Sequence, residues 1–157
     1  MIKPILSFNE SNDLGTVAHR AYRMLADRYN WDLLLASNFE PRKLLYAKNA
    51  TNEGYSVWFL PHSNFISEDD TNGLWKNTFK KDMLLEEWSP DAVIKHGFGL
   101  FSDKTKRVTF AKKASGKYYF MGIYEVVDIE KIGENCYLKI YKKTSTQYPE
   151  QKNNDHM

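Results

Sequence analysis

The sequence predicts an α+β domain in which an N-terminal helix packs on a curved, mostly antiparallel sheet. A helical apolar spacing comes first along the chain, strand-like segments follow, and turn residues separate several of them. The chain has 157 residues, of which 42% are hydrophobic and 15% aromatic, so it can bury a core without disulfides. We therefore expect one domain over residues 1–147 and a polar tail over residues 148–157 that frays.

The helix is expected near the N-terminus, with Ser11 or Asn12 as its N-cap and Asp13 in its first turn. Basic residues, among them Arg20 and Arg23, lie outside its apolar stripe and are interpreted as a solvated face. The stripe itself follows the i, i+3, i+4, i+7 spacing through Leu14, Val17, Ala18, Ala21, Tyr22 and Leu25.

Five later segments read as strands, and turn-forming residues between them predict hairpins. A further segment, residues 75–88, is interpreted as a short helix that ends before Pro90. The predicted strands are residues 43–48, 55–60, 107–112, 116–127 and 136–143.

The fourth predicted strand is apolar on both faces. Strict alternation puts Tyr118, Phe120 and Tyr124 on one face together with Gly122. We expect this face to close the core, while Gly122 lets the strand bend or another backbone approach.

Composition narrows the functional classes. The 22 basic and 20 acidic residues leave a net charge of +2, so any nucleic-acid or membrane partner must be indicated by local clustering. Cys136 is the single cysteine, which agrees with a reducing compartment and, without an apolar run long enough for a membrane, with a cytoplasmic protein.

Catalytic signatures are missing from the sequence, which has no phosphate-binding glycine loop, HExxH or GxSxG motif. His62 follows a strand but has no evident partner, and Glu68, Asp69 and Asp70 are adjacent carboxylates of the kind that is usually solvated. We therefore predict that the chain is not an enzyme, with no catalytic residue, no metal and no cofactor.

Basic residues cluster around the predicted hairpin of residues 107–127, followed at once by aromatic residues. Such a patch suits phosphate groups, although a charged rim that protects a sheet edge is an alternative interpretation. The candidate phosphate-binding residues are Lys104, Lys106, Arg107, Lys112, Lys113 and Lys117.

Aromatic residues suggest a pocket for a planar ring. Trp58 and Phe59 must lie on opposite faces of a strand, so one is expected in the core and the other at a cavity. Trp75 has Asn77 nearby, and an indole with an amide can sandwich a base and bond its edge; alternatively, Trp75 and Trp88 anchor a helix to the sheet. The candidate base-binding residues are Trp58, Trp75, Asn77 and Tyr119.

Residues 107–143 resemble the late strands of the PUA-like superfamily, particularly SRA (YDG) domains, in which a strand of the form Y-x-Y-x-G-x-Y-x-V precedes one that ends in basic residues. The match covers about a quarter of the chain, and Met121 stands where that family would have an aspartate. The resemblance implies a curved PUA-like barrel, a scaffold that in bacteria often reads modified DNA or RNA in restriction and defence systems. The matching residues are Tyr118, Phe120, Gly122, Tyr124 and Val126.

Three functional hypotheses follow. The first is a nucleic-acid-binding module for DNA or RNA that recognises a modified or flipped base and works with an effector nuclease or helicase. The second is a protein-interaction factor, such as a phage or mobile-element inhibitor of a host defence enzyme. The third is a small hydrolase or nuclease that uses His62 with the acids of residues 68–70.

Overall fold

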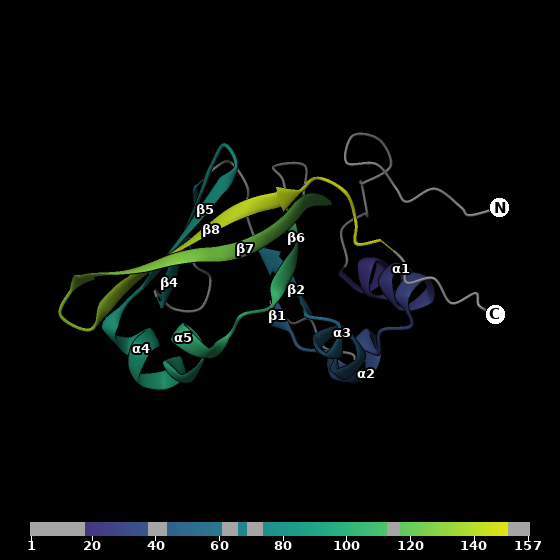
Figure 1. Ribbon diagram of the computed structural model, residues 1–157, viewed down its shortest axis with the longest axis horizontal. Helices are drawn as coiled ribbons and strands as arrows, with labels where there is room; N and C mark the ends of the chain where they lie inside the picture. Colours follow the sequence, from purple (N-terminus) through teal and green to yellow (C-terminus); the bar gives the residue numbers. More distant parts are fainter. Residues whose placement is uncertain (1–17, 38–43, 61–65, 69–73, 113–116, 151–157) are drawn as a thin grey trace.

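A bent, open, mixed sheet with helices at both of its ends forms the domain in the computed structural model (Figure 1). The structure describes residues 18–37, 44–60, 66–68, 74–112 and 117–150, and the side chains of residues 18, 19 and 66–68 are not part of this description. The α+β class is therefore confirmed. The described helices are α1 (Ala18–Tyr29), α2 (Leu33–Ser37), α3 (Lys48–Asn52), α4 (Pro90–His96) and α5 (Phe98–Ser102).

Eight strands form the sheet in the order β1-β2-β6-β7-β8-β5-β4-β3. Every neighbouring pair is antiparallel except β2 and β6, which run parallel. Within the described residues the edge strands β1 and β3 do not pair with each other, so the sheet is open. The strands are β1 (Leu44–Leu45), β2 (Tyr55–Leu60), β3 (Ile66–Glu68), β4 (Trp75–Lys80), β5 (Met83–Trp88), β6 (Lys106–Lys112), β7 (Tyr118–Gly133) and β8 (Cys136–Ser145).

The long strand β7 joins two halves of the sheet. Its first part pairs with β6 and its second part with β8, and Figure 1 shows it running from the left end of the molecule to a point above β6. Helices α1 to α3 gather at the end that holds β1 and β2, while α4 and α5 lie at the other end, below β4. None of the helices in the described part of the chain has the length and apolar character needed to cross a membrane.

Two apolar clusters form on opposite faces of the sheet. Phe59 and Phe110 pack under α1, where Tyr22 and Leu25 face the sheet as the helical spacing predicts. Trp58 belongs to the second cluster, with Phe79 and Tyr141 on the other face. Trp58 and Phe59 thus separate to opposite faces, as expected for neighbours in a strand.

The predicted helix over residues 75–88 is wrong, because this segment forms the hairpin of β4 and β5. Burial alternates along both strands, and Lys81 turns the chain with a φ of 51°. Pro90 does not end a helix but stands at the start of α4, where Ser89 Oγ accepts a hydrogen bond from the Ala92 N–H. The burial pattern therefore has the two-residue period of a strand, and among the charged residues of this segment only Glu86 is buried.

The expected shared face of Phe120 and Tyr124 is also wrong. Thr109 pairs with Gly122 and the next residue, Phe110, pairs with Phe120, so β7 carries an extra residue in a bulge. The bulge changes the alternation, and Phe120 packs under α1 while Tyr124 lies in the second cluster. Gly122 has a φ of +127°, and a Cβ there would lie 2.8 Å from the Ser145 carbonyl oxygen, so the predicted need for glycine holds.

The domain extends past the predicted boundary at residue 147. Tyr148 is 2% exposed, and its ring stacks on Phe120 with the centroids 4.0 Å apart. The hydroxyl of Tyr29 donates a hydrogen bond to the Pro149 carbonyl. Residues 151–157 of the expected tail lie outside the described residues.

Candidate functional site

A pocket of about 850 Å³ lies on the concave side of the sheet, where β1 and β2 face the β4–β5 hairpin and the segment from α4 to β6 closes the third side. Its volume falls in the range of small-molecule sites. Aromatic side chains form much of its lining, and three of them are tryptophans. The lining includes Tyr46, Trp58, Trp75, Asn77, Glu86, Trp88, Lys95, His96, Phe98, Gly99, Asp103, Lys104 and Arg107.

The tryptophans reach the pocket because their strands alternate. Trp58 faces inward from β2, while Trp75 and Trp88 are register partners in the β4–β5 hairpin. The rings of Trp75 and Trp88 meet edge to face, with centroids 5.3 Å apart, a favourable aromatic geometry. The indoles are therefore part of the pocket wall and, for Trp58 and Trp88, part of the packed core as well.

Asn77 follows Trp75 by two residues and lies on the same face of β4. It is 6% exposed, and its Oδ1 is buried without a hydrogen-bond partner among the described residues. An unsatisfied buried carbonyl costs stability. Asn77 lines the pocket and has a buried carbonyl oxygen without a partner among the described residues, so it is a candidate ligand contact.

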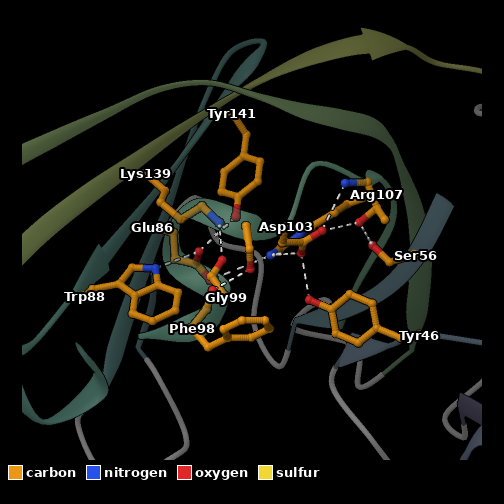
Figure 2. Close-up of polar contacts among 12 residues, drawn as sticks. Tyr46, Ser56, Glu86, Trp88, Phe98, Gly99, Asp103, Arg107, Lys139 and Tyr141 are labelled. Atoms are coloured by element: carbon orange, nitrogen blue, oxygen red, sulfur yellow. Dashed lines mark hydrogen bonds and ion pairs between the residues drawn. The ribbon is translucent and has the colours of Figure 1, made fainter. Parts of the chain in front are cut away.

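Arg107 is the centre of a buried polar network (Figure 2). Its Nη2 donates to Asp103 Oδ2 at 2.8 Å, and its Nη1 lies 3.8 Å from Glu86 Oε2 as a longer ion pair. The guanidinium carbon sits 4.3 Å from the Trp58 ring centroid and 4.9 Å from that of Tyr141. Arg107 Nη1 is itself buried and makes no hydrogen bond within the described residues, so the network leaves one donor group of the guanidinium without an acceptor.

Asp103 is held by three further donors besides Arg107. Its Oδ2 accepts from the Tyr46 hydroxyl at 2.7 Å, and its Oδ1 accepts from the Thr105 hydroxyl at 2.6 Å and the Thr105 N–H at 3.0 Å. Ser56 Oγ lies 2.6 Å from the Thr105 hydroxyl and extends the chain of contacts. This carboxylate is saturated, so it orients Arg107 rather than serving as a free base.

Glu86 joins the network from the opposite wall. Its Oε1 accepts from Trp88 Nε1 and from the Tyr141 hydroxyl, both at 3.0 Å. Its register partner on β8 is Lys139, which is fully buried and donates to the Gly99 carbonyl at 3.3 Å. Figure 2 shows Lys139 and Glu86 side by side above the α5 segment.

The network shifts the titration of its members. Burial by itself would raise the pKa of Asp103, but Arg107 and the hydrogen bonds from Thr105 and Tyr46 place that pKa well below its usual range. Burial would likewise lower the pKa of Arg107, and its anionic neighbours raise it instead. Burial and the nearby Arg107 lower the pKa of Lys139 to about 8.

Three of the four predicted base-binding residues meet in this pocket, namely Trp58, Trp75 and Asn77. The fourth, Tyr119, lies half-buried on β7 as the register partner of Ala111 and does not line it.

The predicted phosphate-binding residues do not form one patch. Arg107 is 3% exposed and ion-paired, so its expected place on a basic surface is wrong. Lys106 and Lys112 mark opposite ends of the seven-residue β6, about 20 Å apart at the rise of a strand. Lys104 lines the pocket, and Lys117 is exposed directly before β7. Lys113 lies outside the described residues.

The sequence analysis missed Glu86, Asp103 and Lys139, as well as the pocket positions of Trp88 and Phe98. The signal for Glu86 was present in the alternation of Leu84, Glu86 and Trp88, which the helical interpretation of residues 75–88 concealed. Asp103 carried no signal, because its role depends on a loop that brings it to Arg107.

Metal binding gains no support from the described part of the chain, where no three His, Cys, Asp or Glu side chains gather as a ligand set. The alternative acids Asp69 and Asp70 and the candidate base His62 lie outside the described residues, as does the side chain of Glu68. No protein-family model matches the sequence, and neither curated proteins nor solved structures give a significant match.

Proposed function

We propose that the chain is a nucleic-acid-binding module that receives one unpaired base in its aromatic pocket. The observation that carries this proposal is the meeting of Trp58, Trp75 and Asn77 in one pocket of about 850 Å³. Indole rings offer stacking surfaces to any base, and an amide can bond a base edge. A flipped base is held in a pocket, and a single-stranded base stacks on aromatic side chains such as these.

Polar groups of the pocket match the edge of a base. Arg107 Nη1 is a donor without a hydrogen bond, and Asn77 Oδ1 is an acceptor without one, among the described residues. Bases carry acceptors and N–H donors on neighbouring edge atoms. A bound base would satisfy both buried groups at once, which favours a base over a purely apolar ligand.

Positive charge at the mouth suits the backbone that would accompany the base. Lys95 and Lys104 are exposed and line the pocket, and the ring of His96 packs on Trp75 with centroids 5.1 Å apart. Lysines in this position contact phosphates without reading sequence. Binding should therefore weaken as salt rises.

The PUA-like resemblance of residues 107–143 belongs to this proposal. We infer a PUA-like module that recognises a modified base in DNA or RNA and serves a cytoplasmic defence system, together with an effector nuclease or helicase. The curved sheet around an aromatic pocket is compatible with that role. The chain itself then binds and does not catalyse.

The test is fluorescence anisotropy with labelled single-stranded and double-stranded DNA and RNA, with and without methylated bases, at two salt concentrations. Trp75→Ala should weaken binding about tenfold, because a stacked base contributes roughly 1–3 kcal/mol. Tyr119→Ala is the matched aromatic control, since Tyr119 is also half-buried but does not line the pocket. Thermal melts verify that both variants fold.

The proposal fails if the wild-type protein binds none of these nucleic acids at low salt. It also fails if Trp75→Ala and Tyr119→Ala bind equally well. Affinity for a protein partner without affinity for any nucleic acid would select the protein-interaction hypothesis instead.

A further inference from the structure

An exposed apolar face runs along α4 and α5 beside the mouth of the pocket. We name it the α4–α5 face and define it by Ile94, Phe98 and Phe101, which are 75%, 90% and 55% exposed. Gly97 has helical φ and ψ, and the Leu100 N–H donates to its carbonyl, so the two helices are nearly continuous. Residues 94, 98 and 101 therefore share one side.

The opposite side of the same helices is anchored. Ala92 and Leu100 are buried with Trp88 in an apolar cluster of their own. A contiguous exposed apolar patch on a soluble domain often marks an interaction site. Since the helices are already held by their inner side, packing does not account for the exposure of Phe98 and Phe101.

The face is continuous with the pocket. Phe98 lines the pocket as well as standing exposed, and Figure 2 shows its ring at the lower edge of the Arg107 network. The ring of Phe101 meets Tyr137 edge to face at 5.6 Å, which fixes its position while half of the side chain stays exposed. Exposed aromatic surface therefore extends outward from the pocket mouth.

Charge identifies the kind of partner. Lys95 follows Ile94 on α4, and Lys104 comes two residues after α5 ends; both are exposed and line the pocket. Asp91 is the one acidic residue of these two helices and lies at the far end of α4. Aromatic rings flanked by lysines suit the bases and phosphates of a single strand.

We infer that the α4–α5 face binds the bases that flank the one in the pocket, so that the ligand is a single-stranded nucleic acid rather than a duplex. This inference rests on the proposed function. The flanking bases of a duplex are paired and stacked within the helix, and their faces are not available to Phe98 and Phe101. An unpaired strand exposes these faces at no further cost of unstacking.

The experiment compares three probes on the full-length chain. They are a labelled mixed-sequence single strand of about 12 nucleotides, within the site size of known single-strand binders, the same strand annealed to its complement, and free mononucleotides followed by tryptophan fluorescence. The single strand should bind at least tenfold more tightly than the duplex. Phe98→Ala and Phe101→Ala should each weaken its binding about fivefold to tenfold.

Leu35→Ala is the control variant, because Leu35 is 69% exposed on α2 at the other end of the domain. It should bind the single strand as the wild-type protein does. Equal affinity for single strand and duplex, or unchanged binding of Phe101→Ala, would overturn the inference, because Phe98 also lines the pocket and Phe101 does not.

Mononucleotides separate this failure from failure of the proposed function. They fit only the pocket, and their binding should depend on Trp75. If they bind while the phenylalanine variants behave as wild type, the pocket function stands and the inference about the α4–α5 face is wrong. If neither mononucleotides nor strands bind, both are wrong.

Discussion

The guanidinium carbon of Arg107 lies 4.3 Å from the centroid of the Trp58 ring. The same side chain is ion-paired with Asp103 and Glu86, and it is nearly inaccessible to solvent. Two carboxylates from different walls of the pocket therefore neutralise the positive charge of Arg107. The Trp58 indole covers one face of the guanidinium. This arrangement makes Arg107 a structural residue of the pocket wall that ties the Asp103 loop to β6.

Arg107→Met should lower the free energy of unfolding by about 3–5 kcal/mol, because it leaves the Asp103 carboxylate buried without its cation. Urea titration measures the change. Lys106→Met is the matched control, since Lys106 is the exposed neighbour on β6. Equal stability of the two variants would show that the ion pair with Asp103 does not hold the loop to β6.

The stability of the domain should rise with pH above about pH 8. The pKa of Lys139 is lowered from 10.5 to about 8 in the folded protein, so in this window the unfolded chain binds more protons than the folded one. By linkage, the free energy of unfolding then increases with pH until Lys139 also loses its proton in the unfolded chain. Below pH 8 both states carry the proton, and this contribution is constant.

Lys139→Met should abolish that rise and be more stable than wild type near pH 7, by about 1–3 kcal/mol. Urea unfolding at several pH values up to about 9 tests it, where unfolded tyrosines, with a pKa of about 10, are still mostly protonated. Lys142→Met, an exposed neighbour on β8, should keep the wild-type slope. A Lys139→Met slope equal to that of wild type would contradict the assignment.

Gly122→Ala should destabilise the domain by at least ~2 kcal/mol, because alanine is strained at a φ of +127° and its Cβ would lie 2.8 Å from the Ser145 carbonyl oxygen. Gly54→Ala separates the two causes. Gly54 also has a positive φ, of +92°, but no atom lies within 4 Å of the added Cβ, so only the backbone strain of about 1 kcal/mol remains. Equal losses in thermal or urea unfolding would mean that the bulge tolerates a side chain.

Tyr148→Ala should lower the free energy of unfolding by about 3–5 kcal/mol, as expected for the loss of a buried aromatic ring. The ring stacks on Phe120, and the residue is only 2% exposed. Tyr148→Phe keeps the ring and removes a hydroxyl that has no hydrogen bond among the described residues, so it should be neutral or slightly stabilising. A chain ending at residue 147 should likewise melt below one ending at residue 150. Identical melting temperatures of these two chains would support a domain boundary at residue 147 instead.

Local patterns were sufficient where one short segment contained the whole signal. The β-branched and aromatic residues of 55–60 predicted β2, and a strand by itself sends Trp58 and Phe59 in opposite directions. The strand pattern of residues 136–143 and the helical spacing through Ala21, Tyr22 and Leu25 were equally local. Patterns of this kind hold because a strand or a helix sets the direction of each side chain by itself.

Local patterns failed where a distant segment decided the outcome. Residues 75–88 look helical by their charged and apolar content, but pairing of β5 with β8 and of β4 with β5 makes them strands. Phe120 and Tyr124 lie on opposite faces because β7 has an extra residue, Met121, where it pairs with β6. The sequence around Arg107 predicts a surface cation, but in the structure the residue is ion-paired with Asp103 and Glu86.

The sequence alone determined the α+β class, the central strands and the need for glycine at position 122, which depend on residue type and on spacing within one element. It also predicted that Trp58, Trp75 and Asn77 line a common cavity, although they come from different segments. Only the tertiary structure decided that these three residues line one pocket without Tyr119, and that Arg107 lies buried among carboxylates. Burial and ion pairing depend on contacts between segments that are far apart in the sequence. The bent sheet brings these segments together around the pocket.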